Sequence, residues 1–236
     1  MFALFGNEIF FINLIKGIRM RKYLLHILII SLLLLIFLQF NSIARASSFI
    51  KIKVNNNVSF QLPRNWVVLS DDNVIILNSL VKSTLSVRSN SNIRFQANLT
   101  NNKGEPLTTV QVYSLHFQDE PSQSRFAEMS EDDLGGYDQM MHEQLARQVS
   151  QSGGRVTDWY GTRKQYIDGL VALTSEYSRS QDFPPVGHAR VQIIRVYSGK
   201  HSFSFVISYY EEAVPPLRSL VDEVVSTLRC LRCEKN

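Results

Sequence analysis

The chain has 236 residues and a formal net charge of +4, from 25 Lys or Arg and 21 Asp or Glu side chains. Five of the basic residues and one of the acidic residues lie in residues 1–46, so the remainder carries twenty of each. A near-neutral remainder without a Lys/Arg cluster gives no electrostatic basis for binding nucleic acid. Its length, about 190 residues, is enough for one domain with its own core.

Residues 20–46 have the three parts of a secretory signal peptide. Basic residues at 21 and 22 precede an apolar run at 24–40, and the small residues Ala44 and Ala46 follow it. This arrangement is typical of a cleaved leader. We therefore expect translation to begin at Met20, cleavage after Ala46, and a mature single domain in the periplasm or outside the cell.

An uncleaved anchor is the alternative interpretation of the same segment. The apolar run approaches the roughly 20 residues that a membrane-spanning helix needs. The protein would then stay anchored by its N-terminus in the inner membrane, and its membrane contact would pass only through residues 20–46. The expected division is in both cases a leader at 1–46 and one domain at 47–236.

The first half of the domain is rich in alternating apolar and polar residues, which indicates strands. Asp71, Asp72 and Asn73 could begin a helix that runs to about residue 87. The strands are expected at residues 49–54, 58–62, 93–99 and 107–117.

A long helix and two hairpins follow. Ser130, followed by acidic residues, predicts a helix start, and Gly153–Gly154 predicts its end. Asp168–Gly169 suits a tight hairpin turn. The apolar side chains expected on one face of the helix are Tyr137, Met140, Met141, Leu145 and Val149. The strands expected in the hairpins are 161–167 with 170–179, and 190–197 with 201–210.

The last element is the clearest helix in the sequence. Pro215–Pro216 is expected to open it, and apolar residues then recur at helical spacing. They are Leu217, Leu220, Val221, Val224, Val225, Leu228 and Leu231. Because hairpins dominate and helices lie between them, the fold class is α+β, with helices packed on the faces of an antiparallel sheet.

Several segments resemble the PsbP-like family, which includes DcrB-like exported proteins. Val58–Trp66 resembles the family's opening strand, proline and tryptophan, and the segments 169–177, 190–210 and 217–228 resemble its later half. The resemblance is one of pattern and covers most of residues 49–231. It implies an antiparallel sheet with helices on both faces, and members that bind or assist other proteins. It transfers no functional residue to this chain.

Cys230 and Cys233 form a C-x-x-C pair at the end of the last expected helix. A thioredoxin-type pair instead opens a helix, where the positive end of the dipole stabilises a thiolate. An oxidising compartment favours pairing, so we expect a disulfide that ties off the C-terminal tail. It requires a non-helical or frayed last turn, because the bond is strained at regular i, i+3 geometry. A redox or metal pair, an intermolecular bond and free thiols are the alternatives.

Two groups of residues are candidates for metal chemistry. His142–Glu143 begins the pattern of a zinc protease, but Ala146 stands where the second histidine is needed. His142 is therefore expected to face solvent. The second group is at the end of a strand and could bind a metal ion or form a solvated loop; its members are His116, Asp119 and Glu120.

The sequence contains no G-x-S-x-G motif, phosphate loop or dinucleotide fingerprint, so we expect no catalytic residue and no cofactor. The favoured function is an exported, non-catalytic binding or accessory protein of the cell envelope, in contact with a protein or a small apolar ligand. One alternative is a metal-dependent or hydrolytic enzyme with a site assembled from distant residues such as His116, Glu176 and His188. Another is a membrane-anchored subunit of an envelope complex. His188 and His201, which flank the last hairpin, could approach each other.

Overall fold

The computed structural model describes residues 49–76, 78, 92–115, 122–181, 187–213 and 217–233. The expected leader, the candidate metal residues His116, Asp119 and Glu120, and Pro215–Pro216 lie outside these ranges. Among the residues described, no helix is both long enough and apolar enough to cross a membrane.

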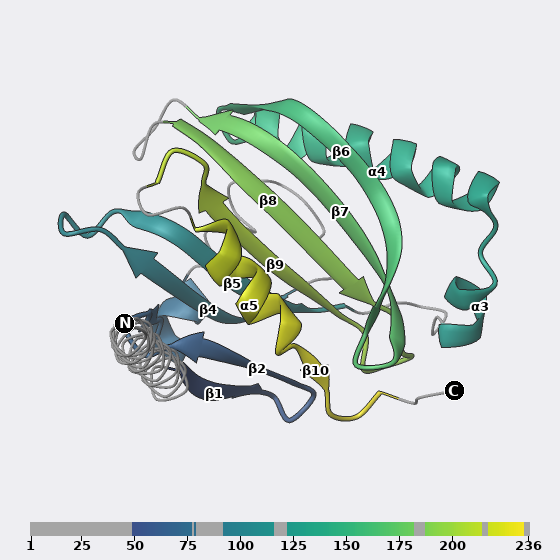
Figure 1. Cartoon of the computed structure of the whole chain (residues 1–236), viewed down its shortest axis with the longest axis horizontal. Helices are drawn as coiled ribbons and strands as arrows, with labels where there is room; N and C mark the ends of the chain where they lie inside the picture. The colour runs from purple at the N-terminus through teal and green to yellow at the C-terminus, as the bar shows by residue number, and fades with distance from the viewer. Residues whose placement is uncertain are drawn as a thin grey trace, which may run out of the picture. The chain divides into compact units, whose positions relative to one another are not determined.

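A seven-stranded antiparallel sheet is the centre of the fold (Figure 1). Its strands stand in the order β3-β4-β5-β9-β8-β7-β6. Their bounds are β3 Val67–Val68, β4 Asn92–Thr100, β5 Pro106–Ser114, β6 Gly154–Ile167, β7 Leu170–Gln181, β8 Gly187–Val196 and β9 Phe203–Tyr210. Neighbouring strands pair antiparallel throughout. The structure therefore confirms the mixed α and β class with antiparallel strands.

One face of this sheet is covered by helix α5 (Arg218–Ser226) and by a second, three-stranded sheet. That sheet has the order β1-β2-β10, from Phe49–Val54, Val58–Pro63 and Arg229–Cys230. Phe60 of β2 is 1% exposed, and its ring meets those of Phe95 and Phe205 edge-on at centroid distances of 5.4 and 5.1 Å. Such aromatic packing carries much of a core's energy. We call this side the α5 face.

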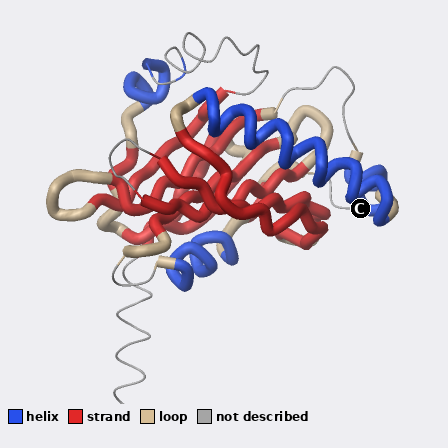
Figure 2. The backbone as a smooth tube through the Cα atoms, turned by 90° about the horizontal axis from the view of Figure 1, so that it is seen from above, coloured by secondary structure: helices blue, strands red, loops and turns tan. Residues whose placement is uncertain are grey.

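Helices α3 (Gln123–Ala127) and α4 (Glu131–Gln151) cover the opposite face, here called the α4 face. Figure 2 shows α4 and α5 on opposite sides of the sheet. Ser130 caps α4, and its hydroxyl and the carboxylate of Asp133 form a reciprocal capping box, as the sequence predicts. Met141, Leu145 and Val149 of α4 pack on Tyr177, Val191 and Ile193 of the sheet.

Turn residues explain how the hairpins close. Asp168 and Gly169 both have positive φ, at 54° and 82°, which is the geometry of a primed two-residue turn. Asn55 and Asn56, between β1 and β2, also have positive φ, which asparagine accepts more readily than most residues. Both hairpins were expected from these residue types.

Five expectations about the elements need correction. Ser70, rather than Asp71, caps the helix that begins at residue 71, and this helix is described only at 71–76 and 78. Met140 is 50% exposed rather than packed. Strand β6 begins at Gly154, seven residues earlier than expected, and β8 begins at Gly187, three residues earlier. Helix α5 ends at Ser226, so Leu231 lies beyond it and is 44% exposed.

Candidate functional site

Strand β6 has a β-bulge at Tyr160, whose side chain lies on the α5 face of the sheet. The pairing of β6 with β7 shifts by one residue between Trp159 and Gly161, whose partners are Tyr177 and Glu176. Tyr160 is the extra residue, and Gly161 supplies the positive φ of 90°. A bulge of this kind re-aims a side chain, and bulges are enriched next to functional sites. Trp159 and Tyr160 point to opposite faces, as neighbouring residues of a strand do, and the bulge adds a residue on the side of Glu176.

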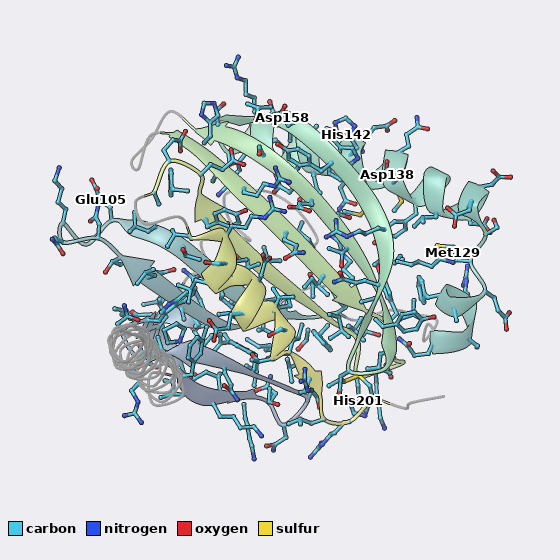
Figure 3. The ribbon with its side chains drawn as sticks, in the orientation of Figure 1. Glu105, Met129, Asp138, His142, Asp158 and His201 are labelled. Carbon is cyan, nitrogen blue, oxygen red and sulfur yellow. A yellow bond between two sulfur atoms is a disulfide. The ribbon has the colours of Figure 1, made fainter. Side chains whose placement is uncertain are left out.

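Asp138 of α4 holds the bulge from the α4 face. Its carboxylate accepts hydrogen bonds from the indole Nε1–H of Trp159 at 3.1 and 3.2 Å and from the backbone N–H of Thr162 at 2.5 Å. His142, one helical turn later, stacks on the Trp159 ring with a centroid distance of 4.8 Å. Figure 3 shows Asp138 and His142 together on α4 beside β6. One helix therefore fixes the position from which Tyr160 projects.

On the α5 face, Tyr160 belongs to a group that we call the Tyr160 cluster: Tyr160, Arg163, Glu176, Ser178, Arg190 and Glu211. Glu176 is its centre. Its two oxygens pair with Arg190 Nε at 2.8 Å and with Arg163 Nη1 at 3.1 Å. Arg190 also approaches Glu211 at 3.6 Å. The side chains of Glu176 and Arg190 are only 14% and 13% exposed, whereas that of Arg163 is 50% exposed.

The ion pairs keep Glu176 ionised. Partial burial alone would raise the pKa of this carboxyl, but hydrogen bonds and charge from Arg190, and then from Arg163, hold the pKa below its usual value. Burial would likewise lower the pKa of Arg190, and Glu176 raises it instead. A carboxylate held in this way accepts hydrogen bonds and does not serve as a proton donor near neutral pH.

Arg190 and Tyr160 form a stacked pair at the surface. The guanidinium carbon of Arg190 lies 3.3 Å from the centroid of the Tyr160 ring, which is a cation–π contact. The Tyr160 hydroxyl lies 3.3 Å from that of Ser178, which donates to Glu211 at 3.0 Å. Tyr160 itself is 47% exposed. The cluster thus presents an exposed aromatic ring on a nearly buried, ion-paired arginine.

The histidine and carboxylate named as candidates for a hydrolytic site have separate partners. His188 Nδ1 lies 2.9 Å from Glu212, and hydrogen bonding to His188 lowers the pKa of Glu212 although partial burial opposes the shift. Glu176 is engaged by its two arginines. Along β8, His188 lies four residues from Gln192, the partner of Glu176, which corresponds to about 13 Å. His188 and Glu176 therefore do not form an acid–base pair.

The expectation that His188 could approach His201 is wrong. His188 lies at the start of β8, beside the pairing partner of Tyr210, whereas His201 lies in the turn between β8 and β9. The length of strand β8, about 30 Å, separates them. His142 is exposed, as expected. In the described part of the chain, no group of three or more His, Cys, Asp or Glu side chains is placed to hold a metal ion.

Cys230 and Cys233 form a disulfide, with their Cα atoms 5.6 Å apart. The bond is compatible with regular backbone because α5 has already ended at Ser226 and Cys230 belongs to strand β10. Arg229 and Cys230 pair with Ser59 and Val58 of β2. The disulfide therefore links β10 to the segment that directly follows it.

Sequence reasoning missed Tyr160, Arg163 and Arg190, although it singled out Glu176. The missing information is the bulge, because the face of each β6 residue cannot be assigned from alternation once the register shifts. The available signal was Gly161 directly after two aromatic residues, since an isolated glycine in a strand suggests a bulge.

The chain matches no protein-family model and no curated protein. Several solved structures are similar in fold at a distance, and two are described here. The solution structure of cyanobacterial PsbP (CyanoP) from Synechocystis sp. PCC 6803 has 14% identity and a TM-score of 0.46, and the match covers 78% of this chain and 92% of that one. The apo structure of the T6SS immunity protein TplEi from Pseudomonas aeruginosa has 12% identity and a TM-score of 0.32, over 79% and 77% of the two chains. The resemblance to PsbP is thus a distant one of fold alone, and neither likeness contributes to the function proposed below.

Proposed function

We propose that the protein is an exported binding or accessory protein of the cell envelope, and that it contacts another protein through the Tyr160 cluster. The observation that carries the proposal is the half-exposed Tyr160 ring stacked on the ion-paired Arg190. Tyrosine and arginine are enriched among the residues that dominate binding energy at protein interfaces.

The cluster is organised before any partner arrives. Arg190 is fixed by Glu176 and Glu211, and the hydroxyl of Tyr160 meets that of Ser178. Ordering a mobile side chain on binding costs about 0.5–1.5 kcal/mol, so side chains that are already ordered give more net affinity. The two arginines and two glutamates balance in charge, which favours a polar and aromatic partner surface over a highly charged one.

In the part of the chain that the structure describes, the pocket beside Arg179 does not suit the small apolar ligand that is the alternative to a protein partner. This pocket, on the α4 face at the end of the sheet where β5 begins, has a volume of about 70 Å³ and includes the polar residues Thr109, Arg179 and Ser208 in its lining. Pockets for drug-sized apolar ligands have volumes of roughly 300–1,000 Å³. The volume and the lining of this pocket do not suit such a ligand.

Export is proposed from the leader and from the domain division at residue 46. The Cys230–Cys233 disulfide supports it, because disulfides persist in oxidising compartments and are rare in the cytosol. N-terminal sequencing of the protein from its own cells tests this step. A start at Ser47 is expected; retention of residues 20–46 would favour the anchored-subunit alternative, and a cytosolic full-length chain would refute export.

The contact is tested by replacing Tyr160 with a photo-crosslinking phenylalanine analogue in intact cells. Tyr166 is the matched control, because it lies on the same strand, is 77% exposed and is outside the cluster. We expect one discrete adduct from position 160, reduced by Arg163→Ala in the same chain, and none of that mass from position 166. Equal adducts from both positions, or none from position 160, would count against the proposal.

A further inference from the structure

Arg179 of strand β7 has no acidic partner among the residues that the structure describes. Its neighbour Ser178 faces the Tyr160 cluster, so strand alternation places Arg179 on the opposite, α4 face. Its Nε atom is buried and makes no hydrogen bond. Arg163 and Arg190, on the other face, differ from Arg179 in this respect, because both form ion pairs with Glu176. Buried polar groups of native proteins usually have a partner, so this atom needs an explanation.

The side chain lies at a small pocket with hydrogen-bonding groups around it. Thr109, Ser208 and Tyr210 contribute to the lining, together with Ala189 of β8. These residues lie side by side across the sheet, because Ser208 pairs with Thr109, Tyr210 with Ala189, and Ala189 with Arg179. The volume of about 70 Å³ is roughly five times the minimum that one water molecule needs. It suits a group of four or five heavy atoms.

Arg179 is the charged side chain among the described residues that line the pocket. Tyr113, Tyr177 and Tyr210 lie within its electrostatic reach, and burial raises the pKa of all three hydroxyls, that of Tyr113 to about 12, so they stay neutral. Two carboxylates act on Tyr210 from outside the lining. Glu212 is paired with His188, and Glu105 accepts a hydrogen bond from the side chain of Asn101.

We propose that the Arg179 pocket binds an oxyanion, the phosphate or carboxylate group of a small ligand. The guanidinium donates to the anion, and the hydroxyls of Thr109 and Ser208 supply further donors beside it. Arginine suits such groups because its planar fork matches two oxygens. The pocket and the Tyr160 cluster occupy opposite faces of the sheet, so this site is separate from the proposed protein contact.

The test measures thermal unfolding of the full chain by intrinsic tryptophan fluorescence, in sodium phosphate, sodium acetate and sodium chloride at matched ionic strength and pH. An anion that binds only the folded state raises the Tm in a saturable way. We expect saturation with phosphate or acetate and none with chloride. Saturation by phosphate alone assigns a phosphorylated ligand, and saturation by acetate alone a carboxylate ligand.

Two variants locate the effect. Arg179→Gln should abolish the anion-dependent rise in Tm. Arg155→Gln, which removes an exposed arginine of β6 whose Nε contacts Ser180, should leave it unchanged. If Arg179→Gln does not fold, Arg179→Lys keeps the charge without the planar fork and should weaken the apparent affinity at least tenfold. A rise in Tm that is the same for chloride, or that persists unchanged in the Arg179 variants, overturns the proposal.

Discussion

Removing the carboxylate of Asp138 should destabilise the protein measurably, although the residue lies on a helix surface. In Asp138→Ala, the indole N–H of Trp159 and the backbone N–H of Thr162 both lose their acceptor. Hydrogen bonds to a charged group contribute about 1.5–3 kcal/mol each. Because the three residues are only half-buried, we take the lower figure for each, which gives a loss of about 3 kcal/mol. The better helix propensity of alanine offsets about 0.5 kcal/mol of this loss in stability.

The expected net loss is therefore about 2.5 kcal/mol in the free energy of unfolding. For a domain of this size that corresponds to a fall in Tm of about 5–10 °C. Urea denaturation followed by tryptophan fluorescence measures the free energy, and circular dichroism measures the Tm. Asp138→Asn should lose about half as much free energy of unfolding. Its side-chain oxygen can still accept the hydrogen bond from the Thr162 N–H, but its NH₂ group then faces the indole N–H of Trp159, and two donors cannot pair.

Glu143→Ala on the same helix is the matched control. Glu143 is exposed and accepts one hydrogen bond, from Gln139 at 3.1 Å. Its removal should change the free energy of unfolding by no more than about 0.5 kcal/mol. If Asp138→Ala is as mild as Glu143→Ala, the bulge does not depend on α4, and the explanation given for the position of Tyr160 fails.

Three further results are expected. Val224→Asp should abolish the cooperative unfolding transition, measured by circular dichroism, because Val224 is fully buried and an unpaired charge there costs more than about 4 kcal/mol. The same substitution at half-buried Val225 should destabilise the protein less. A folded Val224→Asp variant would show that α5 is not packed on the sheet as described. Glu176→Gln should flatten the dependence of stability on pH between about pH 5 and pH 3. The pKa of Glu176 is lowered in the folded state, so its contribution to stability is present above the unfolded pKa and is lost as the pH falls through the folded pKa. Acid unfolding that is the same in the variant and the wild type would contradict the ion-pair account. Cys233→Ser should lower stability by about 2 kcal/mol on the chain-entropy model for a four-residue loop, measured by urea denaturation, and the wild type should give no alkylatable thiol by intact mass without reductant.

The parts of the fold that the sequence predicted are those with a local signal. The capping box at Ser130 and the Asp168–Gly169 turn depend on a few adjacent residues, and both are present as expected. The disulfide between Cys230 and Cys233 also follows from residues three apart. In each case the chemistry of the residue type and the short spacing restrict the backbone to one geometry.

The elements that the sequence misjudged depend on distant contacts. Leu228 continues the apolar spacing of α5 and is completely buried, but α5 has already ended at Ser226, and β10 begins at the next residue, Arg229, to pair with β2. Strand β6 was placed seven residues too late because Gly153–Gly154 marks a helix end and two bulges then interrupt the alternation. At Leu228 the period in the sequence marks a buried side chain, but tertiary pairing decides the backbone that buries it.

The candidate site was less predictable than the fold for the same reason. Glu176, Arg163 and Arg190 come from three strands, and only the register of β6, β7 and β8 brings them together. Glu176 in isolation was compatible with an enzyme, and its two arginine partners change that interpretation. The neutral balance of the domain did not reveal that one arginine, Arg179, makes no ion pair with a described carboxylate.

The edges of the large sheet add a constraint on how a partner can bind. At one edge, β3 has two residues, and the side-chain amide of Asn78 donates to the carbonyl of Ile93 and accepts from its N–H, both at 2.9 Å. At the other edge, Asp138 accepts from the backbone N–H of Thr162. Short edge strands and edges covered by other elements prevent another chain from adding a strand. A partner is therefore expected to contact side chains on a face of the sheet, where Tyr160 lies, instead of extending the sheet at these points.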